Sequence, residues 1–285
     1  MKLARLGPAG AEVPVLLTDG SAFDLRPIVS DATARQEHYL SPSALSEIRQ
    51  AHADGRLEPF AQAEQARIGS PIPRPGSVLC IGQNYAAHAA ESGAEPPEVP
   101  ILFFKPANTV TGPNDPVAIP RNSSKTDWEV ELGVVIGSRA LYLDSPAQAR
   151  EHIAGFVTVN DFSERDFQLA VSGGQWSKGK GAPGFAPVGP HLVTADEVDP
   201  QNLHLRSWVN GEPRQDSSTT DMIFGVDHIV WHLSQYMALD PGDVICTGTP
   251  QGVALSGRFP YLQAGDVVEV EIEALGRQRT EMTQA

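Results

Sequence analysis

Two glutamates that lie two residues apart, Glu129 and Glu131, are the first residues in this sequence whose spacing suggests chemistry. Residues 128–136 alternate as a β-strand does, with five large apolar side chains on one face. The glutamates share the other face, roughly 6.5 Å apart at their Cα atoms because a strand rises about 3.3 Å per residue. Such a pair suits a hard cation such as Mg²⁺, Mn²⁺ or Ca²⁺. A strand with one solvent-exposed face has the same spacing, and Glu269 and Glu271 repeat it.

A cation site needs a third ligand, and Asp161 is the candidate. Residues 155–161 are expected to form a buried strand that ends in this acid. An acid at the end of a strand can instead cap a helix, so its position alone does not decide between the two roles.

A histidine and a glutamate lie three residues apart on a helix predicted within residues 83–93. His88 and Glu91 therefore face the same side of that helix. A carboxylate beside an imidazole raises the basicity of the ring and orients it, as a general base requires. An ordinary surface ion pair would show the same spacing.

A glycine-rich segment at residues 173–184 carries two cations, Lys178 and Lys180. It lacks the spacing of a Walker phosphate-binding loop. As a flexible loop it could place a lysine over an anionic substrate, which would otherwise face a chain with a formal net charge of −14. A plain surface loop is the alternative.

The elements that position these residues are expected to form two domains. Residues 1–72 read as a small N-terminal domain of short strands and a helix over residues 41–53. The proline-rich passage at residues 69–76 marks the boundary. Residues 73–285 form the main domain, which is strand-rich and includes an Asn-Gly hairpin turn at residues 210–211.

The composition limits the classes of function. The 285 residues are 41% hydrophobic and 20% charged, as in ordinary globular proteins. A pI near 4.9 argues against nucleic acid or an anionic membrane as partner. No apolar run approaches the ~18 residues of a membrane span, and we predict a cytoplasmic protein. Cys80 and Cys246 are expected to be buried hydrophobic residues rather than a disulfide or metal ligands.

Taken together, the motifs of this chain resemble the fumarylacetoacetate hydrolase family, in the family's order and over residues 77–285. The stretches that carry the resemblance are Gly82–Glu91, Asp127–Leu132, Asn160–Gln168, Lys178–Lys180, Val209–Glu212 and Pro241–Pro250. Within the family, residues 174–180 and the Met-Lys-Leu start look most like hydrolases of 2,4-diketo-3-deoxy sugar acids, such as those of L-rhamnonate and L-fuconate breakdown.

The resemblance implies an α+β fold, a mixed β-sheet roll with the small N-terminal α+β domain, in a homodimer or larger homo-oligomer. It also implies a Mg²⁺ site, or one for Mn²⁺ or Ca²⁺, and a water-activating pair on a mobile lid. The predicted site consists of the metal ligands Glu129, Glu131 and Asp161, the catalytic residues His88, Glu91 and Lys180, and the substrate-binding residues Arg165, Gln168, Thr249, Lys105 and Tyr85.

One segment departs from the family pattern. Relatives often carry an acid shortly after the loop lysine, whereas Gly181-Ala182-Pro183 follow Lys180 here. The local sequence therefore supplies no carboxylate partner for this lysine.

The predicted function is metal-dependent hydrolysis of a carbon–carbon bond in an acylpyruvate, a small anionic ketoacid. A 2,4-diketo-3-deoxy sugar acid would yield pyruvate and lactate. Alternatives on the same kind of site are oxaloacetate decarboxylation, ketoacid isomerisation or hydration, and ureidoglycolate lyase activity. A metal-dependent binding protein without turnover is the alternative from another class.

Overall fold

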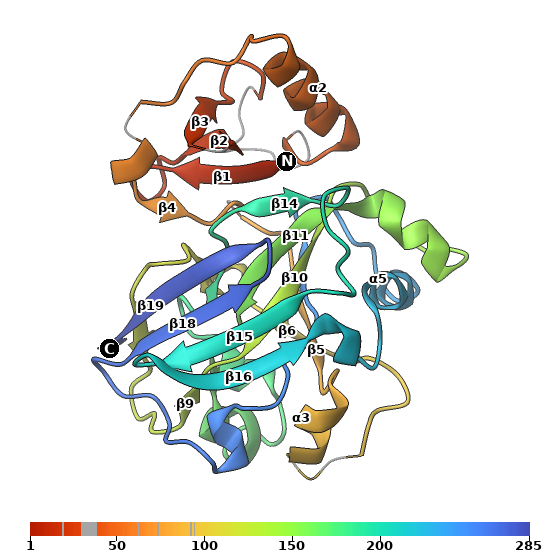
Figure 1. Ribbon diagram of the computed structural model, residues 1–285. Helices are drawn as coiled ribbons and strands as arrows, with labels where there is room; N and C mark the ends of the chain where they lie inside the picture. Colours follow the sequence, from red (N-terminus) through yellow and green to blue (C-terminus); the bar gives the residue numbers. More distant parts are fainter. Residues whose placement is uncertain (19, 30–38, 62, 73, 92, 94) are drawn as a thin grey trace.

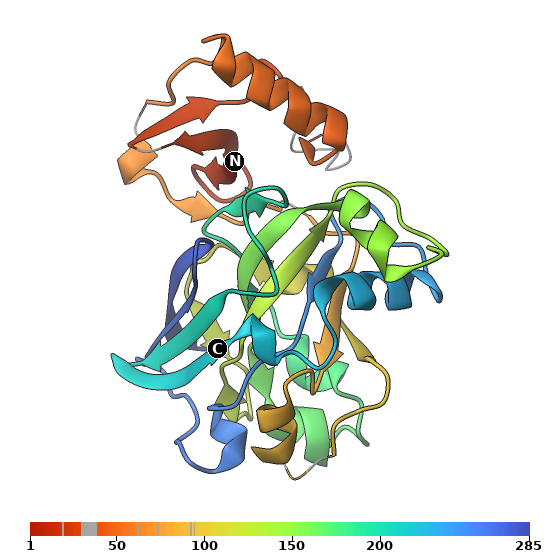
Figure 2. The ribbon, with the colours of Figure 1, turned by 45° about the vertical axis from the view of Figure 1, so that its right-hand side comes forward.

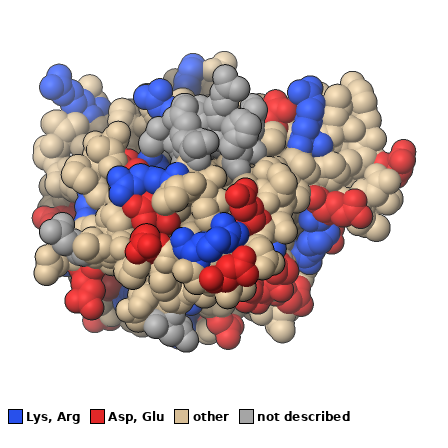
Figure 3. Space-filling model, turned by 90° about the horizontal axis from the view of Figure 1, so that it is seen from above, with Lys and Arg blue, Asp and Glu red and all other residues tan. Residues whose placement is uncertain are grey.

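The computed structural model describes residues 1–18, 20–29, 39–61, 63–72, 74–91, 93 and 95–285. Figure 1 shows the N-terminal strands and helix α2 (Pro42–Ala53) as a small layer above a larger body rich in strands. Figure 2 shows the same separation after a turn of 45°. In Figure 3, which views the molecule from above, acidic and basic side chains are interspersed on the visible face.

Among the described residues, the larger sheet has ten strands and runs through both parts of the molecule. In spatial order they are β3 (Ser21–Asp24), β2 (Val13–Thr18), β1 (Lys2–Leu6), β14 (Leu192–Thr194), β11 (Ile153–Asn160), β10 (Val130–Ile136), β17 (Val244–Cys246), β5 (Val78–Gly82) and β6 (Ile101–Lys105), with β4 (Ile68–Gly69) beside β1. Only the pair β17–β5 is parallel among these described strands.

A second sheet packs against the first. Its order is β16 (Glu212–Ser218), β15 (His204–Val209), β18 (Val267–Ile272), β19 (Gly276–Gln284) and β8 (Val117–Ile119), with β19 and β8 parallel. Two short pairs complete the described strands: β12 (Ser163–Glu164) with β9 (Thr126–Asp127), and β13 (Ala186–Pro187) with β7 (Val110–Thr111). Both large sheets mix parallel and antiparallel pairs, which confirms the predicted α+β roll.

The helices are short. The described α-helices are α2, α3 (Ala86–Glu91), α4 (Ser177–Lys180) and α5 (Val226–Ser234); single turns of 3₁₀-helix lie at η1 (Ala63–Gln65), η2 (Ala107–Thr109), η5 (Thr219–Asp221) and η6 (Ala254–Ser256), a longer one at η3 (Pro146–His152), and a π-helical turn at η4 (Asp166–Ala170). No helix in the described part of the chain is long and apolar enough to cross a bilayer.

Strand β10 is buried on both faces, which is what makes it suitable as the wall of an enclosed site. Leu132, on the predicted apolar face, belongs to a core shared with Val270 of the second sheet. Val135, on the other face, packs in a separate core with Val157 of β11. A polar side chain at the end of β10 therefore enters a space between covered elements rather than open solvent.

The N-terminal strands continue the main sheet, because β1 pairs with β2 on one side and β14 on the other. Helix α2 begins as expected, with the Ser41 hydroxyl accepting a hydrogen bond from the Ala44 amide at 3.2 Å. The division of domains at residue 72 stays a prediction.

Two local predictions also meet the structure here. The hairpin turn has positive φ at Asn210 (54°) and Gly211 (81°), as the Asn-Gly pair indicated. Cys80 and Cys246 are buried and free, and they lie opposite each other on β5 and β17.

Candidate metal and active site

Three buried carboxylates meet where β10 and β11 pair. Glu129 directly precedes β10, Glu131 lies within it, and Asp161 directly follows β11. The antiparallel register places residues 129 and 161 opposite each other, so the Asp161 amide donates to the Glu129 carbonyl at 2.9 Å. One oxygen from each carboxylate lies within 4.8 Å of the others, and none of the three residues is more than 3% exposed.

Lys180 supplies positive charge to two of these carboxylates. Its Nζ donates to Glu129 Oε2 and to Asp161 Oδ2, each at 2.6 Å. The partners that the local sequence did not provide thus come from two separate strands. Lys178, one turn earlier, is exposed and reaches only a backbone carbonyl, that of Ser172 at 3.4 Å.

Lys105 approaches Asp161 from the other side. Its ammonium group binds Asp161 Oδ1 and the Phe162 carbonyl, and the side chain is fully buried. Lys105 was predicted to bind substrate, but in the structure it contacts the presumptive metal ligand and does not line the cavity.

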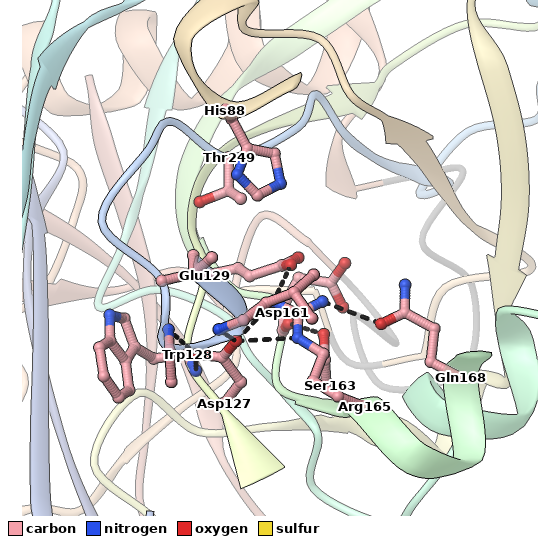
Figure 4. Close-up of polar contacts among 12 residues, drawn as sticks. His88, Asp127, Trp128, Glu129, Asp161, Ser163, Arg165, Gln168 and Thr249 are labelled. Carbon is pink, nitrogen blue, oxygen red and sulfur yellow. Dashed lines mark hydrogen bonds and ion pairs between the residues drawn. The ribbon is translucent and has the colours of Figure 1, made fainter. Parts of the chain in front are cut away.

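Arg165 is held between two acids. Its Nε lies 2.8 Å from Asp127 Oδ2, its Nη2 lies 2.6 Å from Glu129 Oε1, and its Nη1 donates to Gln168 Oε1 at 2.9 Å (Figure 4). Burial by itself would lower the pKa of Arg165, but the two carboxylates outweigh it and hold the pKa above its usual value. The guanidinium is therefore fixed and charged at the floor of the site.

Asp127 is a functional residue that sequence reasoning missed. Besides Arg165, its carboxylate accepts hydrogen bonds from the backbone amides of Ala254 and Leu255, at 2.8 and 2.9 Å. The signal was present, because Asp127 stands two residues before Glu129 in the same strand pattern. Its role depends on η6, which is more than a hundred residues away in sequence.

Glu131 is the carboxylate that lacks a cation. Its Oε2 accepts a hydrogen bond from the Gly248 amide at 2.8 Å. Burial, followed by the nearby charges of Asp161 and Glu129, raises the pKa of Glu131 well above its usual range. A buried carboxylate in this state is short of positive charge.

The donor set fits a hard divalent cation. Four buried carboxylates (Asp127, Glu129, Glu131 and Asp161) stand against three cationic side chains (Lys105, Arg165 and Lys180), which leaves an excess of negative charge. Oxygen ligands from carboxylates are those that Mg²⁺, Mn²⁺ and Ca²⁺ prefer. Glu129, Glu131 and Asp161 are the residues that could hold such an ion.

His88 lies on α3 with its ring directed toward this cluster. Figure 4 shows the imidazole and Thr249 on the opposite side of an open space from Glu129 and Asp161. The ring is 8% exposed, and its Nδ1 has no hydrogen-bond partner among the described residues. Burial lowers the pKa of His88 despite the opposing charges of Glu129 and Glu91, so the ring is neutral near pH 7.

Glu91 is close to His88 but is held mainly by other groups. Its Oε2 lies 4.0 Å from His88 Nδ1, which is longer than a hydrogen bond. The same oxygen accepts from the Gly252 amide at 3.0 Å, while Oε1 pairs with Arg258 at 3.1 Å. The shared helix face predicted for the pair is present, with Glu91 anchored to the loop after β17.

These side chains surround one cavity of about 290 Å³. It is lined by Ile81, Gly82, Gln83, His88, Glu91, Phe103, Glu129, Glu131, Arg165, Gln168, Leu169, Trp176, Lys180, Thr249 and Leu255. Asp161 lies just behind this surface, where the two lysines cover it. Tyr85, a predicted substrate-binding residue, is fully buried outside the lining, and its hydroxyl finds no partner in the part of the chain that the structure describes.

Comparison with known proteins shows the relationships of the chain. Residues 77–283 match the fumarylacetoacetate (FAA) hydrolase C-terminal family. A candidate hydrolase of Burkholderia multivorans, named without a substrate, is 46% identical over 283 residues, which cover 98% of this chain and 97% of the relative.

Two solved structures resemble it over their whole length. A 2-hydroxyhepta-2,4-diene-1,7-dioate isomerase from Mycobacterium marinum has a TM-score of 0.76 at 32% identity, covering 100% of this chain and 98% of the other. A maleylpyruvate hydrolase from Sphingobium sp. SYK-6, solved with manganese(II) and pyruvate, has a TM-score of 0.82 at 25% identity, with 100% of both chains covered. With its buried acidic triad, this chain is an enzyme of the fumarylacetoacetate hydrolase family, which includes both hydrolases and isomerases.

Proposed function

We propose that the chain is a divalent-cation-dependent hydrolase that cleaves the bond between C3 and C4 of an acylpyruvate. The observation that carries the proposal is a neutral, unpartnered His88 facing a buried carboxylate triad across a cavity. The manganese and pyruvate in the structure of the maleylpyruvate hydrolase support a pyruvate-containing substrate.

Glu129, Glu131 and Asp161 would hold the cation, Mg²⁺ or Mn²⁺ with Ca²⁺ as a further candidate, and when bound it supplies positive charge for the oxygens of a 2-oxo acid. The protein's own cations add to this charge. Lys180 and Arg165 both line the cavity, so they give an anionic substrate a local attraction that the acidic chain as a whole does not.

Gln168 orients the substrate in this proposal. Its Oε1 is occupied by Arg165, which fixes the orientation of the amide group. The amide nitrogen is then the donor directed at an oxygen of the substrate. Thr249 plays a structural part, because its hydroxyl donates to the Val130 carbonyl at 2.9 Å and accepts from Gln215 at 2.7 Å.

His88 acts as the general base. It takes a proton from a water molecule as the water oxygen bonds to C4 of the substrate. Glu91 then stabilises the imidazolium, and Lys180 donates a hydrogen bond to the oxyanion that forms on C4. When the adduct collapses, the C3–C4 bond breaks, its electron pair passes to the pyruvate fragment as an enolate, and His88 returns the proton to C3.

The products are pyruvate and the carboxylic acid of the acyl group. A 2,4-diketo-3-deoxy sugar acid, to which the sequence of residues 174–180 points, would give pyruvate and lactate. A homodimer or larger homo-oligomer remains part of the proposal.

Isomerisation of a ketoacid is the second candidate, favoured by the likeness to the isomerase from Mycobacterium marinum. An isomerase also needs a base in this cavity, but no water attacks carbon and no bond of the chain breaks. Oxaloacetate decarboxylation, hydration and ureidoglycolate lyase activity differ in the same way by their products.

A product assay tests the proposal. The protein, loaded with Mn²⁺ or Mg²⁺, is given acetylpyruvate, 2,4-diketo-3-deoxy-L-rhamnonate, oxaloacetate and ureidoglycolate. We expect equal amounts of pyruvate and carboxylic acid from a diketo acid, and loss of turnover with EDTA. Release of CO₂ or a double-bond shift without cleavage would choose an alternative reaction.

Substitution of the base separates an enzyme from a binding protein. We expect His88→Ala to abolish turnover while the affinity for pyruvate, measured by calorimetry with Mn²⁺ present, stays within a few-fold. His228→Ala, on the surface helix α5, is the matched control. Equal turnover in both variants would contradict a catalytic role for His88.

A further inference from the structure

The cavity has an apolar wall that the proposed chemistry does not use. Ile81 of β5, Phe103 of β6 and Trp176, which directly precedes α4, all line it. Each comes from a different element, so the wall exists only in the folded chain. Ile81 and Phe103 are buried, and the Trp176 side chain is partly buried.

Trp176 is fitted into place by its neighbours. Its ring meets the Phe103 ring edge to face, with centroids 5.7 Å apart and planes at 65°. The backbone of Gly82 lies directly beneath the indole, and a Cβ atom at that position would overlap the ring. The chain thus uses a glycine to let a large aromatic side chain lie against β5.

The wall begins beside the reacting end of the cavity. The Nζ atom of Lys180 lies 4.9 Å from the centroid of the Phe103 ring, and the same atom binds Glu129 and Asp161. A substrate whose ketoacid end reaches the carboxylate triad would therefore place its acyl group along Phe103 and Trp176.

The polar groups of the cavity are already assigned. Arg165 and Lys180 are paired with carboxylates, Gln168 with Arg165, and the Thr249 hydroxyl with Val130 and Gln215. Gln83 is the remaining uncharged polar side chain of the lining. Several hydroxyls on an acyl chain would lose water here without gaining matching partners, which weakens binding.

Building on the proposed hydrolysis of acylpyruvates, we infer that the acyl group is apolar, an alkyl chain of several carbons or an aromatic ring, and that Trp176, Phe103 and Ile81 select it. A hydroxylated sugar-acid chain is then a poorer substrate. This selectivity would separate the chain from the sugar-acid hydrolases that its loop sequence resembles.

A series of substrates tests this selection. We would measure kcat/KM with Mn²⁺ for acetylpyruvate, pentanoylpyruvate, benzoylpyruvate and 2,4-diketo-3-deoxy-L-rhamnonate. Each buried methylene should raise kcat/KM roughly fourfold, which gives ~60-fold for the three that separate pentanoylpyruvate from acetylpyruvate. The sugar acid should fall below pentanoylpyruvate by at least tenfold.

Variants show whether the wall is responsible. In Trp176→Ala and Gly82→Ala the ratio of kcat/KM for pentanoylpyruvate over acetylpyruvate should fall toward one, whereas Trp176→Phe should keep part of it. Trp208→Ala, in the second sheet, is the matched control and should leave the ratio unchanged. Circular dichroism and the ratio itself, which does not depend on the active fraction, guard against misfolding.

The two levels of the proposal fail differently. If the protein cleaves acetylpyruvate but cleaves the sugar acid as well as pentanoylpyruvate, or if Trp176→Ala keeps the wild-type ratio, the inferred selectivity is wrong and the hydrolase assignment stands. If no acylpyruvate is cleaved, the proposed function is wrong and the inferred selectivity falls with it.

Discussion

Two strands of this protein carry the same Glu-Val-Glu sequence, at residues 129–131 and 269–271, and they differ in every other respect. The first pair is almost fully buried, whereas the side chains of Glu269 and Glu271 are 22% and 27% exposed. The second pair faces Arg277, at 3.1 and 3.8 Å, and Glu271 also pairs with Arg206. One spacing thus gives a candidate metal site in one sheet and a solvated ion-pair network in the other.

The surroundings of the strands explain the difference. Strand β10 lies between β11 and β17 in the middle of the large sheet, with a hydrophobic core on each face. Strand β18 lies between β15 and β19, and its buried side chains alternate with partly exposed ones. Acids on β18 keep contact with water, while those beside β10 lose it and must gain charged partners.

Neutralising one glutamate of each pair should give the largest contrast. We expect Glu129→Gln to lower kcat/KM on a cleaved diketo acid by roughly a thousandfold or more, because several kcal/mol of charge stabilisation are lost. Mn²⁺ binding, followed by calorimetry, should weaken in parallel. Glu269→Gln should leave both within about twofold, as expected of a surface substitution. Similar losses in both variants would contradict the distinction between the strands.

The cation that bridges the buried acids should matter for stability. We expect Lys180→Met to lower the free energy of unfolding of the metal-free protein by about 3 kcal/mol, because it leaves buried carboxylates short of charge. Lys178→Met, an exposed neighbour on the same helix, should change it by less than about 0.5 kcal/mol. Urea denaturation in EDTA measures both. Equal values would mean that Lys180 does not neutralise the triad.

The buried acids should also control a nearby titration. Burial holds the pKa of His88 below its ordinary value of 6.5, while Glu129 opposes this shift. The ring must be neutral to accept a proton, so kcat/KM should fall tenfold per pH unit below that pKa. In metal-free protein, NMR should show a lower His88 pKa in Glu129→Gln, because the imidazolium loses a favourable charge. Glu269→Gln should leave the titration unmoved.

The smallest effect is expected on the exposed strand. Arg277 pairs with both acids there and stacks on Trp208, with the guanidinium 4.3 Å from the ring centroid. Arg277→Ala should still lower the free energy of unfolding by no more than about 1 kcal/mol, because exposed ion pairs contribute little. Activity should be unchanged. A loss of several kcal/mol in urea denaturation would show that this network resembles the buried one.

Much of the fold could be predicted from sequence because local patterns correspond to local structure. The alternation over residues 128–136, the Asn-Gly turn and the serine cap of α2 each depend on neighbours within a few residues. Predictions that depended on where an element ends were less accurate. The helix expected over residues 227–239 ends at Ser234, and α4 forms inside a segment expected to be a flexible loop.

The site divides in the same way. The residue types and spacings of the acidic triad and of His88 with Glu91 were sufficient to propose metal binding and a general base. Asp127, the apolar wall and the partners of Lys180 could not be read from the chain. Each depends on contacts between residues that are distant in sequence, such as Asp127 with Leu255 or Trp176 with Gly82.

By itself, the sequence determined which groups are available: three acids, a histidine and lysines, placed at strand ends where side chains of different strands can converge. Only the tertiary structure decided which acids lose their water. The spacing of Glu129 and Glu131 is the same as that of Glu269 and Glu271, and the energetic difference arises because burial removes solvation and makes charge compensation necessary. Burial is a property of the packed sheets, and no spacing along one strand encodes it.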